Sequence, residues 1–315
     1  MARLARSNPL TMQLAITLVS PDPDVLPAAQ ERVELILPLS SAVVTSRKLL
    51  GPGALDIEIE SNLTLDMAEV RRALRQDIDE TLEGLAVDTA VQPSAGRRKR
   101  LFIADMDSTI ISCECLDELA DFAGVKAQVA AITERAMQGE IGFEGALRER
   151  VGMLKGLPMS ALQSCYDERV RLNPGARALV QTLRAHGVRC VLVSGGFTFF
   201  TERVAETAGF HKQRANRFIE DGQTLAGKVE EPILGREAKL AALREEVQLL
   251  EVNPAAACAI GDGANDLAMI EAAGLGVAYR AKPVVAAQAD CRIDHADLTA
   301  VLYFQGYSVE DFAAD

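Results

Sequence analysis

The fold can be predicted from one stretch of sequence, Lys99-Arg-Leu-Phe-Ile-Ala-Asp-Met-Asp-Ser-Thr109. Its apolar run, residues 101–104, is typical of a buried parallel strand. The run ends in two carboxylates, Asp105 and Asp107, which point to the same side if the segment is extended. Because a core gains nothing from unpaired charges, this pair indicates a cation site. A strand that simply ends in an acidic turn is the alternative interpretation.

Two later strands end in polar residues in the same way. Residues 188–193 lead into Ser194-Gly-Gly196, and residues 255–260 lead into Gly261-Asp-Gly263, with Asn265 and Asp266 behind them. Helical patterns alternate with the strands, at 199–208, at 238–247 and at 267–273. This alternation predicts an α/β fold, a Rossmann-like parallel sheet with ligands at the carboxyl ends of its strands. The mostly helical residues 115–168 predict a cap inserted after the first strand, at about 112–175.

The polar strand ends suit a phosphate and a metal ion. Asp105, Asp107 and Asp262 supply the hard oxygen ligands that Mg²⁺ prefers. Ser194 and the N–H groups of the two following glycines can bind phosphate oxygens, and Lys239 adds a positive charge. Magnesium and lysine together would supply the local positive charge that an acidic chain needs in order to bind a phosphate.

Each of these features has a simpler interpretation when it is taken alone. Ser194-Gly-Gly196 could be a tight turn between strand and helix, and Lys239 could be a solvated lysine on a charged helix face. Gly261-Asp-Gly263 resembles the start of a dinucleotide-binding fingerprint, but Asp266 stands where the third glycine is needed. The convergence of the three strand ends favours the phosphate site.

The N-terminal residues predict a separate small module. Strands are expected at 12–19, near 41–47, at 54–60 and within 84–91, and helices at 24–37 and 66–82. The order β-α-β-β-α-β is that of a ferredoxin-like α+β domain, and it resembles an ACT-type regulatory domain. Residues 54–60 alternate apolar and acidic side chains, which predicts one solvated face.

The segment 92–99 is interpreted as a linker, with domains at 1–94 and 95–315. It contains Pro, Gly and Ser, and its basic residues run on to Arg100. A nucleic-acid patch is the alternative, and a solvated linker is favoured.

The overall composition narrows the class of protein. With 45 acidic and 33 basic residues, the net charge of −12 argues against nucleic acid or an anionic membrane as a partner. Six cysteines without a CxxC pair favour a reducing compartment, and there is no apolar run long enough to span a bilayer. A cytoplasmic location is therefore expected.

The four motifs together resemble those of the haloacid dehalogenase-like (HAD) phosphohydrolases. They are Asp-x-Asp-Ser-Thr, the strand-end Ser-Gly-Gly, the helical Lys239 and Gly-Asp-Gly-Ala-Asn-Asp, which begins at Gly261 and is the most specific. Within that superfamily, Glu114 and Met137-x-Gly-x-x-x-Phe143-x-x-x-Leu-Arg-x-Arg150 resemble the cap of the phosphoserine phosphatases. The resemblance covers about residues 100–303, without a departure at a motif position.

The resemblance implies roles for the residues of the core. Asp105 would be the nucleophile that forms an aspartyl-phosphate, and Asp107 the acid and base. Mg²⁺ would be held by Asp105, Asp262 and the backbone carbonyl of Asp107. The remaining core residues would bind or support the phosphate: Ser194, Gly195, Lys239 and Asn265 as contacts, and Asp266 through its neighbours.

The resemblance assigns substrate choice to the cap. Glu114 would bind the ammonium and Arg150 the carboxylate of O-phospho-L-serine, while Met137 and Phe143 shield the site. Arg148 competes with Arg150, but residues two apart on a helix face different ways, so only one should reach the substrate.

The expected activity is Mg²⁺-dependent hydrolysis of phosphoserine, the last step of serine biosynthesis. Another small phosphomonoester, transfer of the phosphoryl group to an alcohol, and a non-catalytic amino-acid sensor are the alternatives. An amino-acid effector at the N-terminal domain and a homodimer are hypotheses that rest on the ACT-like order of elements.

Overall fold

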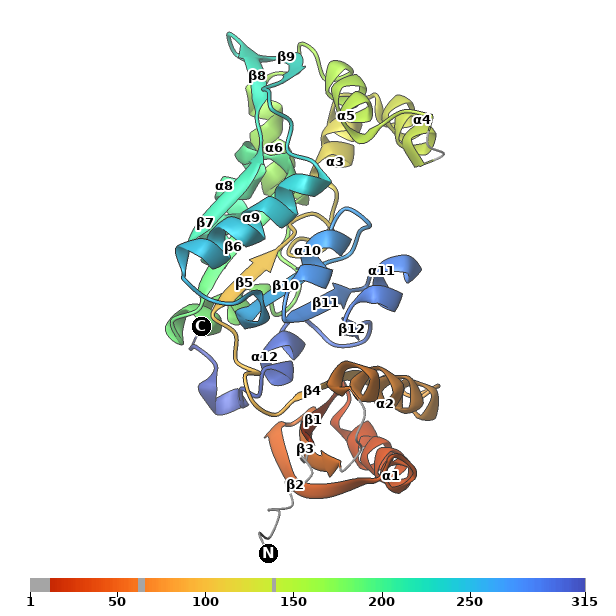
Figure 1. The fold of residues 1–315 in the computed structure, drawn as a ribbon. Helices are drawn as coiled ribbons and strands as arrows, with labels where there is room; N and C mark the ends of the chain where they lie inside the picture. The colour runs from red at the N-terminus through yellow and green to blue at the C-terminus, as the bar shows by residue number, and fades with distance from the viewer. Residues whose placement is uncertain (1–11, 62–65, 138–139, 315) are drawn as a thin grey trace, which may run out of the picture.

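Two sheets organise the protein in the computed structural model, which describes residues 12–61, 66–137 and 140–314 (Figure 1). A four-stranded sheet belongs to the N-terminal module and a six-stranded sheet to the larger core, with a separate two-stranded hairpin. Within the described residues, no helix is long and apolar enough to cross a membrane.

The N-terminal module has the predicted β-α-β-β-α-β order. Its elements are β1 (Met12–Val19), α1 (Leu26–Ile36), β2 (Ala42–Gly51), β3 (Ala54–Ser61), α2 (Met67–Thr81) and β4 (Asp88–Pro93). The strands lie in the order β2-β3-β1-β4 and all pair antiparallel. Helix α2 begins where Asp66 accepts the Ala68 N–H at 2.8 Å, and it buries an apolar stripe of Val70, Leu74 and Ile78.

The core sheet confirms the predicted parallel α/β fold. Its strands are β5 (Leu101–Ala104), β6 (Arg189–Phe197), β7 (Lys212–Asn216), β10 (Ala257–Gly261), β11 (Leu275–Tyr279) and β12 (Cys291–Ile293). They run parallel in the order β12-β11-β10-β5-β6-β7. The strands β5, β6 and β10, which carry the polar ends, are therefore neighbours.

Helices cover both faces of this sheet because side chains alternate along each strand. Leu101 and Ile103 pack with α9 (Arg236–Leu249) and α10 (Leu267–Ala272). Phe102 and Ala104 face the larger cluster that includes α7 (Ala176–Ala185), α8 (Thr198–Ala208) and α12 (Ala300–Phe304). All four side chains are fully buried, which explains why the run is continuously apolar.

Helix α9 is also joined to the sheet by a buried carboxylate that pairs with two partly exposed cations. The carboxylate of Glu246 is 1% exposed and accepts from Lys212 Nζ at 2.7 Å and from Arg189 Nε at 3.2 Å. Burial alone would raise the pKa of Glu246, but these two hydrogen bonds outweigh it and hold the pKa below its usual value.

The cap is helical, as predicted, but it also includes a hairpin that the sequence analysis missed. Its helices are α3 (Cys115–Phe122), α4 (Lys126–Met137), α5 (Phe143–Gly152) and α6 (Met159–Arg169). The hairpin of β8 (Phe218–Asp221) and β9 (Thr224–Val229) joins them through backbone hydrogen bonds, 2.8 Å from the Gly156 N–H to the Leu225 carbonyl. Polar, exposed residues dominate β8, so its periodicity is weak.

The interpretation of residues 97–100 as a solvated linker is wrong for two of its four basic residues. Arg97 and Lys99 are each 8% exposed. Arg97 forms an ion pair with Asp56 of β3 and donates to Thr17 Oγ1 at 2.8 Å and to the Phe304 carbonyl of α12 at 3.3 Å. Asp56 is thus buried instead of lying on the solvated face that the alternation predicted. The segment fastens the N-terminal module to the core.

Candidate active site

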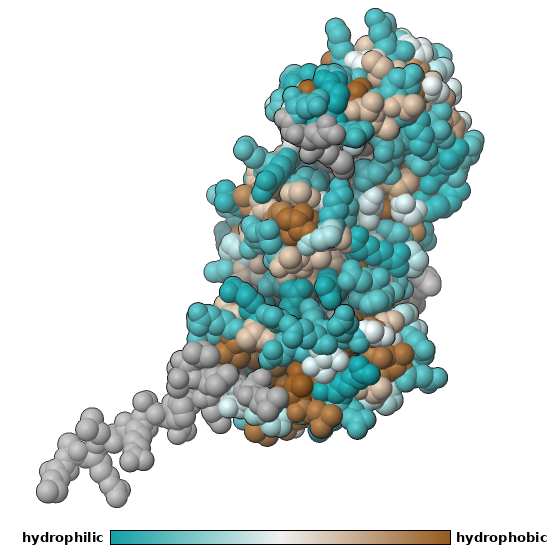
Figure 2. Space-filling model, turned by 90° about the vertical axis from the view of Figure 1, so that its right-hand side faces the viewer, coloured by the Kyte–Doolittle hydropathy of each residue, from teal (hydrophilic) through white to brown (hydrophobic). Residues whose placement is uncertain are grey.

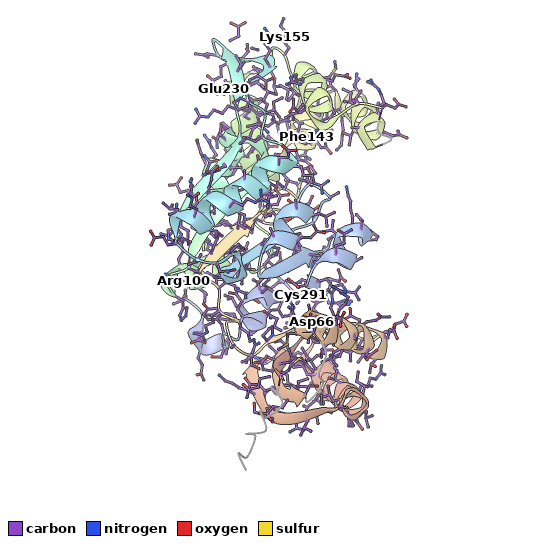
Figure 3. All side chains as sticks on the ribbon, viewed as in Figure 1. Asp66, Arg100, Phe143, Lys155, Glu230 and Cys291 are labelled. Carbon is purple, nitrogen blue, oxygen red and sulfur yellow. The ribbon has the colours of Figure 1, made fainter. Side chains whose placement is uncertain are left out.

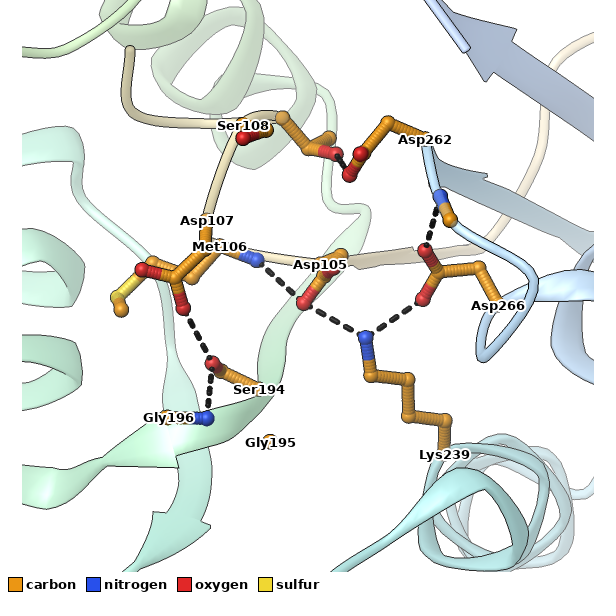
Figure 4. A network of polar contacts seen from close by, with 12 residues as sticks. Asp105, Met106, Asp107, Ser108, Ser194, Gly195, Gly196, Lys239, Asp262 and Asp266 are labelled. Atoms are coloured by element: carbon orange, nitrogen blue, oxygen red, sulfur yellow. Dashed lines mark hydrogen bonds and ion pairs between the residues drawn. The ribbon is translucent and has the colours of Figure 1, made fainter. Parts of the chain in front are cut away.

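The carboxyl ends of β5 and β10 meet at a buried lysine (Figure 4). Lys239 extends from α9 so that its Nζ lies 2.7 Å from Asp105 Oδ1 and 2.6 Å from Asp266 Oδ1. The second oxygen of Asp266 accepts the Gly263 N–H at 3.0 Å. Both oxygens of Asp266 are therefore in use, and this residue holds Lys239 in place.

Burial dominates the electrostatics of this group. The side chains of Lys239 and Asp105 are 2% and 7% exposed. Burial raises the pKa of Asp105, while the charge of Lys239 opposes that shift. Burial would lower the pKa of Lys239, but the Asp105 and Asp266 carboxylates outweigh it and hold the pKa above its usual range. The lysine therefore keeps its proton and its charge.

Asp107 is held by two donors at the end of β6 and the start of α3. Its Oδ2 accepts from the Ser194 hydroxyl at 3.0 Å, and its Oδ1 accepts the Cys115 N–H at 2.9 Å. Burial raises the pKa of Asp107, which favours the protonated form that a general acid needs. A Cβ at Gly196 would lie 2.9 Å from both Asp107 Oδ2 and Ser194 Oγ, so a larger residue here would displace one of these side chains.

The residues present fit a divalent cation. Carboxylate oxygens of Asp105, Asp262 and Asp266 lie within 4.8 Å of one another. Asp262 accepts the Thr109 hydroxyl at 2.9 Å through one oxygen, and burial raises its pKa. Hard oxygens at this spacing suit Mg²⁺ better than a soft metal.

A cavity of about 530 Å³ connects these strand ends with the cap. It is lined by most of the predicted core and cap residues: Asp105, Asp107, Glu114, Phe143, Arg150, Ser194, Gly195, Asp262 and Asn265. Lys239 and Asp266 lie behind Asp105 and do not line it. Nothing is described for the Met137 side chain, so its predicted shielding role lies outside the described residues.

The cap residues present opposite charges to this cavity. Ser108 Oγ donates to Glu114 Oε1 at 2.7 Å, and burial together with the charge of Asp107 raises the pKa of Glu114 to about 7. Arg150 lines the cavity, whereas Arg148 is exposed and forms ion pairs with Glu144 at 3.0 Å and Glu231 at 2.7 Å.

Phe143 forms one wall of the cavity at the start of α5 (Figure 3). Its ring lies over two glycines, because a Cβ at Gly195 would meet Phe143 Cζ at 3.4 Å and one at Gly235 would meet Phe143 Cδ1 at 3.2 Å. The ring therefore spans from the cap to the core next to Gly195 of β6.

The structure adds residues that the sequence analysis did not single out. Ser108 adopts a left-handed conformation, with φ of 55°, beside the two aspartates, and such backbone strain clusters at functional sites. Asp117, Thr133 and Lys282 also line the cavity. The Asp-x-Asp-Ser-Thr motif contains Ser108 and Thr109, so these two residues could have been identified from the sequence. Thr133 and Lys282 lie in no motif that would have identified them.

The fold and the site define a class of hydrolase. The sequence model of the haloacid dehalogenase-like hydrolases matches residues 102–271, more than half of the chain. A HAD family hydrolase of Salmonella enterica serovar Typhi superposes with a TM-score of 0.79 at 28% identity, over 93% of this chain and 98% of that one. The class is therefore the HAD hydrolases.

Curated relatives narrow the class further. The phosphoserine phosphatase of Archaeoglobus fulgidus is 43% identical over 239 residues, covering 75% of this chain and 68% of that protein. The phosphoserine phosphatase of Polaromonas sp. is 45% identical over 224 residues, covering 70% of this chain and 95% of that protein. A substrate-bound phosphoserine phosphatase structure matches with a TM-score of 0.61 and 36% identity, covering 66% of this chain and 98% of that one. This chain belongs to the phosphoserine phosphatase family of HAD hydrolases.

Proposed function

We propose that this phosphatase hydrolyses O-phospho-L-serine to L-serine and phosphate, as the last step of serine biosynthesis, through an aspartyl-phosphate on Asp105. The observation that carries the proposal is the position of Asp105. It lies in the cavity, with Lys239 behind it and Asp107 beside it. Mg²⁺ would bind at Asp105, Asp262 and the backbone carbonyl of Asp107, and when bound it would neutralise charge on the phosphoryl group.

Asp105 acts as the nucleophile. Its Oδ1 accepts from Lys239 and from the Met106 N–H at 2.8 Å, which fixes the plane of the carboxylate. One carboxylate oxygen attacks phosphorus, the new O–P bond forms, and the bond from phosphorus to the serine oxygen breaks. The buried lysine keeps Asp105 oriented, and its positive charge, 2.7 Å from Asp105 Oδ1, stabilises the negative charge that develops on the phosphoryl group bound to Asp105.

Asp107 moves the proton. In its protonated form it gives the proton to the departing serine oxygen, and as a carboxylate it then takes a proton from the water that attacks the aspartyl-phosphate. The Cys115 N–H holds the carboxyl group in one orientation for both steps, and the Ser194 hydroxyl, which donates to Asp107 here, turns to a phosphoryl oxygen when the substrate binds. Ser194, the Gly195 N–H and Asn265 contact the phosphoryl oxygens.

Glu114 and Arg150 select the substrate. The carboxylate of Glu114 pairs with the serine ammonium, and the guanidinium of Arg150 pairs with the serine carboxylate. Phe143 excludes water while the phosphoryl group is transferred, and Met137, which precedes it in the cap motif, is proposed to do the same.

Phosphate release from a panel of phosphorylated metabolites, with Mg²⁺ present and with a chelator, tests the proposal. Phosphoserine should be the preferred substrate, and Asp105→Asn should abolish its hydrolysis. A preferred substrate other than phosphoserine would refute the proposed substrate. Near-normal turnover by Asp105→Asn would refute Asp105 as the nucleophile. Adding an acceptor alcohol tests for phosphotransfer, and inactivity on every ester would leave the sensor alternative.

The N-terminal module, assigned to residues 1–94, is proposed to bind an amino-acid effector. A cavity of about 420 Å³ between this module and the core is lined by Asp79, Glu83, Arg292 and His295, which can pair with both ends of a zwitterion. Titration of L-serine into the full chain by calorimetry, with Arg292→Gln as the comparison, tests this. No heat at millimolar serine would contradict it.

A homodimer through the same module is proposed from its surface. Leu35, Val43 and Leu49 of α1 and β2 are 71%, 63% and 70% exposed, and β2 is an edge strand of its sheet. Figure 2 shows apolar groups among polar ones on the module, at the lower end of that face. Light scattering should report twice the chain mass, and a monomer at micromolar concentration would contradict the proposal.

A further inference from the structure

Lys282 lines the active-site cavity, and the mechanism above gives it no role. It precedes α11 (Pro283–Gln288), and its backbone N–H donates to the Asp262 carbonyl at 3.1 Å. Its side chain is exposed, unlike that of Lys239, which is 2% exposed. Lys282 is thus a solvent-accessible cation fixed next to a proposed metal ligand.

The cavity needs such a cation on the side of the core. Five carboxylates line it, those of Asp105, Asp107, Glu114, Asp117 and Asp262, in a chain of net charge −12. Among the described lining residues, the cations are Arg150, which comes from the cap, and Lys282. A phosphate dianion that approaches the strand ends from solvent would meet Lys282 before it reaches the buried Lys239.

The other end of α11 is bound to the N-terminal module. Arg75 of α2 donates to the carbonyl oxygen of Ala289, and also to that of Ala286 at 3.5 Å. Arg71 of the same helix pairs with Asp290 at 3.0 Å. In Figure 1, α2 lies beside the end of the core that carries β12, on the same side as α11.

This connection is short and stiff. Helix α11 has six residues, so Lys282 and the carbonyl groups that Arg75 holds are separated by less than two helical turns. The second oxygen of Asp290 accepts the Gly276 N–H of β11 at 2.8 Å, and β11 pairs with β10, the strand that leads into Asp262. Helix α11 therefore contacts both α2 of the N-terminal module and the core strands that lead to the active site.

We propose that Lys282 draws the phosphate group of the substrate into the active site, and that the N-terminal module sets the position of Lys282 through the contact of Arg75 with α11. The proposal rests on the proposed function, since it assumes a phosphorylated substrate in this cavity. Arg75 is the positioning residue in this proposal, whereas Lys282 attracts the phosphate group during substrate capture and forms no covalent bond in the reaction.

The first experiment measures KM and kcat for Lys282→Gln, Lys282→Arg and the matched control Lys228→Gln, an exposed lysine on β9. Lys282→Gln should raise KM, and the Ki of inorganic phosphate, by about fivefold, as expected for a partly solvated charge pair. The variant should change KM more than kcat, and the increase in KM should be smaller at about 1 M salt. Lys282→Arg should keep a KM close to that of the unmodified enzyme. Equal KM values for Lys282→Gln and Lys228→Gln would overturn the role of Lys282.

The second experiment tests the connection to the module. Arg75→Met should raise KM in the same salt-dependent way, whereas Arg72→Met, at an exposed position of the same helix, should not. In the Lys282→Gln background, Arg75→Met should add nothing, because the charge that it positions is gone. Additive effects, or no effect of Arg75→Met in a variant of normal thermal stability, would overturn the coupling.

These outcomes are separate from the test of the proposed function. If the unmodified enzyme prefers another phosphomonoester, the proposed substrate is wrong, and the same variants are then measured on that ester and on inorganic phosphate. The phosphate Ki describes binding of the phosphate group alone, so it reports on Lys282 whichever ester serves as the assayed substrate.

Discussion

Arg97→Met provides the sharpest test of how the two parts of the chain are joined. In the native protein the guanidinium pairs with Asp56, and Arg97 Nη2 lies 2.8 Å from Asp56 Oδ1 and 2.8 Å from Thr17 Oγ1. Both side chains of the pair are 8% exposed. Methionine fills much of the same space but leaves the Asp56 carboxylate buried, with a hydrogen bond from Thr17 in place of the ion pair.

The magnitude follows from that unpaired charge. Breaking a buried ion pair by removing one partner costs about 3–5 kcal/mol, because the remaining charge stays out of water. Arg98→Met is the matched control in the same segment, since Arg98 pairs with Asp311 at 2.9 Å but is 49% exposed. An exposed pair of this kind contributes about 0–1 kcal/mol.

The assay is urea unfolding at pH 7, followed by circular dichroism, for the two single variants and for Arg97→Met combined with Asp56→Asn. The double variant should recover about half or more of the loss, because it removes the charge that Arg97→Met leaves unpaired. A loss below about 1 kcal/mol for Arg97→Met, or a double variant less stable than the single one, would refute this reasoning.

Three further predictions concern the site and the sheet. Gly196→Ala should lower kcat by about 10²-fold, because the added methyl displaces Asp107, and an unchanged melting temperature would show that the effect is local. Arg150→Ala should raise KM for phosphoserine by about 10- to 100-fold and spare an ester without a carboxylate, with Arg148→Ala as the control; equal losses on both esters would exclude the assigned role. Glu246→Gln should destabilise the protein at pH 7 but not at pH 3. The lowered pKa of Glu246 means that its contribution is present above the unfolded value of about 4.5 and is lost as pH falls through the folded value. Urea unfolding at the two pH values measures this difference, and equal stability of the two proteins at pH 7 would contradict it.

Much of the core could be predicted because its information is local. The run 101–104 is buried on both faces of a parallel sheet, so it had to be apolar throughout, and the aspartates behind it stood out. Helix α2 could also be predicted, because Asp66 is a typical N-cap residue and apolar residues recur every four positions along the helix. The hairpin β8–β9 was missed because it is short, one of its two strands is mostly exposed, and its partners are in the cap.

The sequence by itself determined the order of elements and the residue types at the strand ends, since both depend on burial patterns and on chemistry within a few residues. Tertiary structure alone decided which charges are buried. Arg97 and Lys99 have the composition of a solvated linker, yet Asp56, a residue far away in the chain, makes burial of Arg97 favourable. It also decided that Lys282 reaches the cavity, because its position depends on how α11 packs between the active site and the N-terminal module. Charge pairing across distant segments depends on distance in space, and no local pattern in the chain records that distance.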